Sequence, residues 1–293
     1  MEVHCKMPKK KIATIIALCL VGALILSACS GREKQGEKQN VSGTIIAAGS
    51  TAMQPLVEEA ANQFMAKNPG IQVQVQGGGS GTGLKLVSDG TVQIGNSDVP
   101  AEDKLDKEKA KELIPHKVCV VGFAVIVNPA VKVDNLTKDQ LIGIFTGKIT
   151  NWKEVGGDDL KIVVINRPAG SGTRATFTKY ALDGREETQG MALTQDSSGT
   201  VKKAVADTPG AISYIALSYV DSSVKVVKLD GVEPSKENIV EGKYPVWSYE
   251  YMYTKGEAAG VVKTFIDYML GDEVKPIIEK LGYIPIGDMK VTR

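Results

Sequence analysis

From residue 43 onward, short apolar runs alternate with segments whose apolar residues recur at helical spacing. Residues 54–68 carry apolar side chains at i, i+4 and i+8, which is the stripe of an amphipathic helix. Residues 71–75 instead alternate apolar and glutamine side chains, which is strand periodicity. The predicted strands of this part are 45–48, 71–75 and 92–95, and its helices are 54–68 and one that opens at 77–83. This order predicts an α/β fold with helices covering a parallel sheet.

The rest of the chain continues the alternation. Further predicted strands are 118–127, 162–165, 211–215, 224–229 and 245–253, and further helices are 136–145, 175–182, 199–207, 257–270 and 272–281. We interpret strands 118–127 and 245–253 as crossings between two domains, which form a hinge beside a cleft. The expected lobes are 43–126 with 249–293 (lobe 1) and 127–248 (lobe 2).

Polar loops stand at the ends of the predicted strands. Ligands of open α/β sheets collect outside the carboxyl ends of the strands. The side chains expected at this edge in the first domain are Ser50, Thr51, Ser80, Thr82 and Asp98.

A further loop, Asn166-Arg167-Pro168-Ala169-Gly170-Ser171-Gly172-Thr173-Arg174, joins a buried strand to a helix. Its small residues leave bare backbone N–H groups at a helix start, where the helix dipole also favours an anion. Arg167 adds a planar guanidinium that suits a tetrahedral oxyanion. The alternative is an ordinary capped helix start.

Asp98 is the unusual member of this set, because an ionised carboxylate repels an anion. A carboxylate only accepts hydrogen bonds, so it suits a ligand that carries a proton. Phosphate keeps a proton at neutral pH whereas sulfate does not, and a buried acceptor should reject the unprotonated ion. The alternative is that Asp98 only shapes the turn before Pro100.

Composition narrows the classes of function. The 35 basic and 34 acidic residues give a net charge of +1 at pH 7, which does not indicate a nucleic-acid-binding surface. Of the four cysteines, only Cys119 lies beyond residue 29, inside an apolar run, and we expect it to be a buried hydrophobe. The two histidines offer little for a metal site or a Ser-His-Asp triad, so we expect neither metal nor cofactor.

The N-terminus predicts export. Lys9-Lys10-Lys11 precedes an apolar run at 12–26, and Leu26-Ser27-Ala28-Cys29 resembles a bacterial lipoprotein signal. We therefore expect a signal peptide at 1–28, lipidation of Cys29, and an extracytoplasmic location on the outer face of the cell membrane. The alternative is a transmembrane anchor. The polar segment 29–42 is predicted to be a flexible tether.

Motifs for catalysis are weak. The run Gly77 to Gly83 fits neither the P-loop nor the dinucleotide fingerprint, and G-x-S-x-G is absent around Ser80 and Ser171. Hydroxyls, glycine amides, one arginine and one aspartate bind an oxyanion without activating it. We therefore expect a binding protein and no enzyme.

Several motifs together resemble the phosphate-binding proteins of bacterial high-affinity phosphate ABC transporters. They are Gly49-Ser50-Thr51, Gly79-Ser80-Gly81-Thr82-Gly83, Ser97-Asp98-Val99-Pro100, Arg167 with Gly170-Ser171-Gly172-Thr173-Arg174, Phe145 to Trp152, Thr208 to Ile212 and Gly282-Tyr283-Ile284-Pro285. The resemblance runs from about residue 43 to the C-terminus. It implies a two-lobed periplasmic-binding-protein fold (type II-like), with two parallel-sheet domains joined by a two-strand hinge.

The resemblance also implies a ligand and partners. Phosphate would be held without water between the lobes and delivered to the permease subunits of the transporter by a lipid-anchored monomer. The implied ligand residues are Thr51, Ser80, Asp98, Arg167, Ser171, Gly172 and Thr173, with Ser50 as a substitute contact because Ala52 stands where some members have an aromatic residue. Arg174 either helps or faces solvent. The alternatives are a receptor for sulfate or molybdate, and a phosphoester hydrolase that uses Ser80 or Ser171.

Overall fold

The computed structural model describes residues 42–188 and 193–293. The predicted signal peptide (1–28), Cys29 and all of the predicted tether (29–42) except its last residue lie outside the described residues. No helix in the described part of the chain combines the length and the apolar character needed to cross a membrane.

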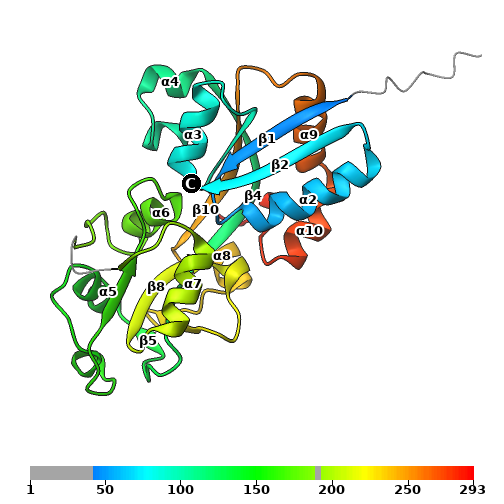
Figure 1. Ribbon diagram of the computed structural model, residues 1–293. Helices are drawn as coiled ribbons and strands as arrows, with labels where there is room; N and C mark the ends of the chain where they lie inside the picture. Colours follow the sequence, from blue (N-terminus) through cyan, green and yellow to red (C-terminus); the bar gives the residue numbers. More distant parts are fainter. Residues whose placement is uncertain (1–41, 189–192) are drawn as a thin grey trace, which may run out of the picture. The chain divides into compact units, whose positions relative to one another are not determined.

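A first group of strands is parallel and follows the predicted order. β1 lies between β2 and β3 and pairs with both in parallel, and helices α2 and α3 connect the three strands (Figure 1). The bounds are β1 (Gly43–Gly49), α2 (Gln54–Lys67), β2 (Ile71–Gly78), α3 (Ser80–Ser88) and β3 (Ile94–Ser97). β3 begins and ends two residues later than expected, and because it ends at Ser97, Asp98 follows the strand directly.

The middle of the chain forms a second group of strands. β6 pairs in parallel with β8 and β7, and β9 pairs in parallel with β5. The strand bounds are β5 (Asn135–Leu136), β6 (Val163–Asn166), β7 (Leu193–Thr194), β8 (Ala211–Ala216) and β9 (Lys225–Leu229). The helices are α5 (Lys138–Phe145), α6 (Gly172–Tyr180), α7 (Ser198–Asp207) and α8 (Lys236–Val240).

Two long antiparallel strands lie between the groups, so the sheet is mixed. β10 (Trp247–Lys255) pairs with β3 and with β4 (Leu113–Val127). β4 pairs with β10 as far as Gly122 and with β8 from Phe123 onward. β4 starts five residues earlier than expected, because Pro115 and the polar residues after it hide this part of the strand from an apolar pattern.

The remaining helices close the chain or fill short connections. They are α4 (Lys107–Lys111), α9 (Gly260–Leu270), α10 (Lys275–Lys280) and the 3-10 turns Ala101–Asp103, Trp152–Val155, Leu217–Tyr219, Asp272–Val274 and Ile286–Asp288. The predicted helix 272–281 is thus a 3-10 turn followed by α10. The short elements α4, α8, β5 and β7 show no usable periodicity, which is why the sequence does not predict them.

Packing and caps position the helix starts at the strand ends. Behind α6, the rings of Phe177 and Tyr214 stack with centroids 3.9 Å apart, and Phe145 meets Phe177 edge-on. Thr137 caps α5 in a capping box with Gln140. These contacts fix the second strand group against its helices.

Gly83 lets α3 lie directly against the end of β1. A Cβ atom there would be 2.4 Å from the carbonyl oxygen of Ala48 and 2.6 Å from Cα of Gly49. Both neighbours are backbone and cannot rotate away. The close approach fixes the first turn of α3, and Ser80 with it.

We expect Gly83→Ala to lower the free energy of unfolding by about 1–3 kcal/mol, because an added methyl group overpacks this contact. Urea unfolding of the variant and the native protein measures the difference. Gly287→Ala is the matched control, since nothing lies within 4 Å of its Cβ position. Equal unfolding midpoints for Gly83→Ala and the native protein would contradict the close packing of α3.

Candidate functional site

Loops from both strand groups meet at the carboxyl ends of their strands. Nη2 of Arg167, after β6, lies 3.3 Å from Oγ1 of Thr51, after β1. Oγ1 of Thr173, in α6, donates to Oδ2 of Asp98, after β3, over 2.8 Å. The structure therefore brings together residues that are more than seventy positions apart in the sequence.

The predicted site side chains are buried as one cluster. Exposed fractions are 4% or less for Ser50, Thr51, Ser80, Asp98, Arg167, Ser171 and Thr173. Gly172 has no room for a side chain, because a Cβ atom there would be 2.2 Å from Oγ of Ser80. Thr82, in contrast, is exposed.

Three helices begin at this cluster: α3 at Ser80, α6 at Gly172 and α7 at Ser198. The first backbone N–H groups of a helix have no partner within the helix, and the helix dipole adds positive potential there. Thr51 Oγ1 accepts from the Ser198 N–H over 3.2 Å, so the start of α7 contacts the loop after β1. Converging helix starts favour an anion.

Arg167 is a buried cation with part of its guanidinium unused. Its Nε donates to the carbonyl of Gln195 and its Nη2 to the carbonyl of Asp196, each over 3.0 Å. Nη1 is buried and has no hydrogen-bond partner among the described residues. Burial lowers the pKa of Arg167, which the nearby Tyr214 and Asp98 oppose. A buried guanidinium with a free N–H is suited to an oxyanion.

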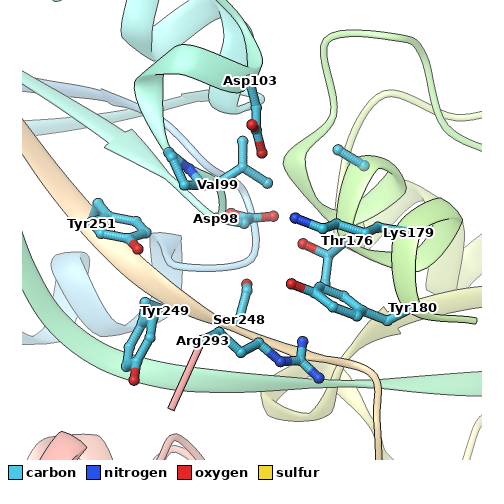
Figure 2. A pocket seen from close by; sticks show the side chains of 12 residues that line it. Asp98, Val99, Asp103, Thr176, Lys179, Tyr180, Ser248, Tyr249, Tyr251 and Arg293 are labelled. Carbon is cyan, nitrogen blue, oxygen red and sulfur yellow. The ribbon is translucent and has the colours of Figure 1, made fainter. Parts of the chain in front are cut away.

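Asp98 provides the complementary acceptor. Its backbone N–H donates to Ser80 Oγ over 3.0 Å, and Oδ2 accepts from Thr173. Oδ1 is buried and no donor reaches it from the rest of the described chain. Figure 2 shows the carboxylate at the edge of a pocket, between Tyr251 of β10 and the α6 side chains of Thr176 and Lys179. Asp98 therefore presents an unpaired acceptor oxygen beside this pocket.

Two predicted serines also shape the backbone. Oγ of Ser171 accepts from the Arg174 N–H over 3.1 Å and caps α6, and Oγ of Ser50 accepts from the Met53 N–H over 3.0 Å. A hydroxyl that accepts one bond still has its O–H to donate. Both serines can therefore cap the backbone and donate to a ligand.

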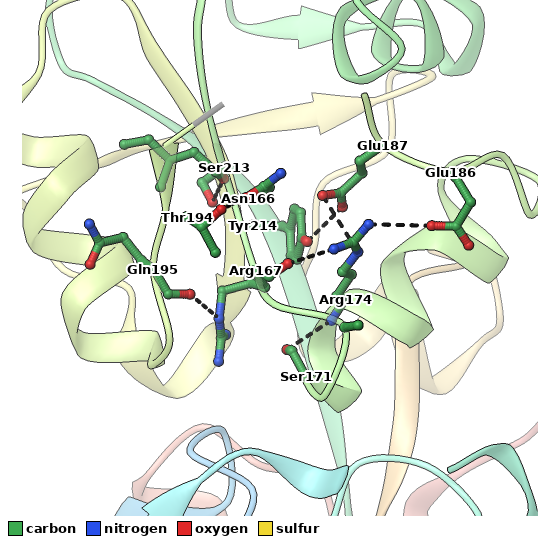
Figure 3. A network of polar contacts seen from close by, with 12 residues as sticks. Asn166, Arg167, Ser171, Arg174, Glu186, Glu187, Thr194, Gln195, Ser213 and Tyr214 are labelled. Carbon is green, nitrogen blue, oxygen red and sulfur yellow. Dashed lines mark hydrogen bonds and ion pairs between the residues drawn. The ribbon is translucent and has the colours of Figure 1, made fainter. Parts of the chain in front are cut away.

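Arg174 lies behind the site and supports Arg167 (Figure 3). Its Nη1 donates to the Arg167 carbonyl over 2.8 Å, and its Nη2 pairs with Glu186 at 3.3 Å. Its Nε lies 3.8 Å from Glu187, which accepts from the Tyr214 hydroxyl over 2.6 Å. Burial raises the pKa of Glu187 to about 7, although the Tyr214 hydrogen bond acts in the opposite direction. Arg174 is thus 9% exposed and does not face solvent.

Sequence reasoning missed the residues that α7 brings to the site. Ser198 is fully buried, with its Oγ 3.3 Å from Thr51 Oγ1. The segment Asp196-Ser197-Ser198-Gly199-Thr200 has the same Ser/Gly/Thr composition as the other loops, and this signal could have found it. The carbonyls of Gln195 and Asp196 have no signature, because every residue carries one.

The described residues offer little for other chemistries. No group of three His, Cys, Asp or Glu side chains suited to a metal ion occurs within 42–188 and 193–293. Cys119 is buried as predicted, and burial raises the pKa of its thiol well above the usual value.

Comparison with known proteins places the chain in a family. A family model for the PBP superfamily domain matches residues 35–273. The phosphate-binding protein PstS of Bacillus subtilis (strain 168) is 51% identical over 295 residues, which cover 97% of this chain and 97% of that protein.

Solved structures agree with this placement. A substrate-binding protein from Clostridium perfringens, assigned to phosphate ABC transport and solved with bound phosphate, is similar with a TM-score of 0.78 and 35% identity, covering 83% of this chain and 100% of that chain. An ABC-type phosphate transport receptor from Vibrio cholerae has a TM-score of 0.67 and 31% identity over the same shares. The fold is therefore the predicted periplasmic-binding-protein fold. The chain belongs to the PstS family of phosphate-binding proteins, within the PBP superfamily.

Proposed function

We propose that the cluster binds inorganic phosphate and that the protein delivers it to the permease of an ABC transporter. The observation that carries the proposal is that the site holds both a buried acceptor, Oδ1 of Asp98, and a buried donor, Nη1 of Arg167. Neither atom has a hydrogen-bond partner among the described residues. Phosphate carries a proton that it can donate to Asp98, and unprotonated oxygens that can accept from Arg167. The relative from Bacillus subtilis is named a phosphate-binding protein, which supports this ligand.

The groups around the proposed phosphate have different roles. Asp98 accepts the phosphate proton, and Arg167 pairs with the negative charge. Hydroxyls and helix-start amides complete the shell, from Ser50, Thr51, Ser80, Ser171, Gly172 and Thr173.

We propose that two lobes, 43–126 with 249–293 and 127–248, close on the ion. Support comes from β4, which pairs with strands of both groups, and from direct contacts between them. Gly81 N–H donates to the Gly170 carbonyl over 2.9 Å, and the Tyr219 hydroxyl donates to the Thr51 carbonyl over 2.8 Å.

The setting of the protein is also a proposal. The lipoprotein-like Leu26-Ser27-Ala28-Cys29 supports a lipid anchor at Cys29 on the outer face of the cell membrane. We propose that a monomer works there without a cofactor or catalysis.

A phosphoester hydrolase is the weaker candidate. Ser80 and Ser171 each accept a backbone N–H, and His116, the only histidine of the described residues, contacts Thr254. A general base beside either serine is what this chemistry would need. Hydrolysis of a generic phosphoester by the protein would favour this candidate.

Asp98→Asn tests selection by the ligand proton. We expect the preference for phosphate over sulfate to fall by about tenfold or more, because the amide can also donate to an unprotonated oxygen. Calorimetric titration with each ion gives the ratio. Asp106→Asn, at an exposed aspartate, is the control that should keep the native ratio. Unchanged selectivity in Asp98→Asn would show that this carboxylate does not select the ligand, and a receptor for sulfate or molybdate would become the better reading.

Arg167→Lys tests the guanidinium. We expect phosphate affinity to fall by about 10- to 100-fold, because an ammonium group cannot hold the Gln195 and Asp196 carbonyls and the ligand with one planar fork. Affinity is measured by the same titration. Arg185→Lys, at an exposed arginine, should bind as the native protein does. Native affinity in Arg167→Lys would remove Arg167 from the site.

A further inference from the structure

Glu250, in β10, lies across from Asp98. The antiparallel pairing of β10 with β3 sets Tyr251 opposite Ser97, so the next pair in this register is Glu250 and Asp98. Directly opposite residues of an antiparallel pair point to the same side of the sheet. The β10–β4 register also shifts between Glu250 and Tyr251, and such irregularities re-aim the side chains beside them.

Glu250 is enclosed in the interior of the protein. The side chain is fully buried, and neither carboxyl oxygen has a hydrogen-bond partner within 42–188 and 193–293. The titratable groups that face it are Asp98, Cys119 on β4 and Tyr283. Burial, and then the charge of Asp98, raise the pKa of Glu250 well above its usual value. Burial thus favours the protonated form of Glu250.

Asp98 has the opposite surroundings. Its Oδ2 accepts from Thr173, and its carboxylate interacts with the charges of Arg167 and Lys104. Hydrogen-bond donors and cations favour the ionised form of a carboxyl group. The two neighbouring carboxyl groups therefore lie in different environments.

We propose that Glu250 is a positioning residue for the phosphate site, holding the single proton of the Glu250–Asp98 pair so that Asp98 alone is the carboxylate that accepts the ligand proton. The inference rests on the proposed function. A second negative charge at Glu250 would repel the bound anion without adding a contact to it. Loss of the Glu250 proton at alkaline pH therefore weakens phosphate binding.

The test is titration of the full chain with inorganic phosphate from about pH 6 to about pH 10. Glu250→Gln keeps a neutral polar side chain that cannot ionise, so we expect affinity within about threefold of native at neutral pH and a smaller loss at alkaline pH. Glu250→Leu leaves Asp98 against an apolar group, and we expect about a tenfold loss of affinity at neutral pH. Glu233→Gln, at an exposed glutamate, should follow the native profile.

The titrations separate the role of Glu250 from the proposed binding of phosphate. A Glu250→Gln profile that coincides with the native one over the whole range would overturn the role of Glu250, as would a change in its affinity at neutral pH above about tenfold. If Glu250→Leu does not fold, the Glu250→Gln profile decides alone. Absence of phosphate binding by the native chain would instead refute the proposed function.

Discussion

The pairing of β4 with both strand groups is the constraint on which the site depends. β4 pairs with β10 as far as Gly122 and with β8 from Phe123 onward, so a single strand sets how the carboxyl ends of the two groups face each other. Loops from those ends then supply complementary groups, such as Thr51 with Arg167 and Asp98 with Thr173. A change in the register of β4 would separate these partners while leaving each loop intact.

We propose that the polar groups at the meeting point prefer one class of ligand. A buried donor or acceptor without a partner costs about 1–3 kcal/mol, more if charged. Nη1 of Arg167 and Oδ1 of Asp98 are both in this position among the described residues. An ion that offers a donor and an acceptor together satisfies both atoms, whereas an ion without a proton leaves Asp98 unsatisfied and repelled. The proposed selectivity then follows from hydrogen-bond complementarity more than from total charge.

The sequence predicted the elements that have a clear apolar pattern and missed the features that depend on tertiary contacts. Apolar periodicity predicted α2 and β2 closely, because each buries one face against the core, and a continuous apolar run predicted the buried strand β1. It shortened β4, since pairing with β10 overrides the polar residues at its start. The loop motifs predicted Asp98, Arg167 and Thr173, which the structure brings to one cluster.

Other features of the site have no local signature. The Gln195 and Asp196 carbonyls that hold Arg167 come from a loop whose contribution is backbone alone. Glu250 reads as a polar residue in a strand, and only the register of β10 with β3 places it opposite Asp98. Arg174 is an arginine in a glycine-rich loop, and the structure is needed to show that it supports the Arg167 backbone.

Calorimetric titration of the native protein with phosphate and then sulfate, after removal of carried-over ligand, tests the central claim most directly. A buried acceptor carboxylate beside a buried guanidinium predicts tight one-to-one binding of phosphate and a negligible response to sulfate. Equal or tighter binding of sulfate would contradict selection by the ligand proton, although the fold would stand.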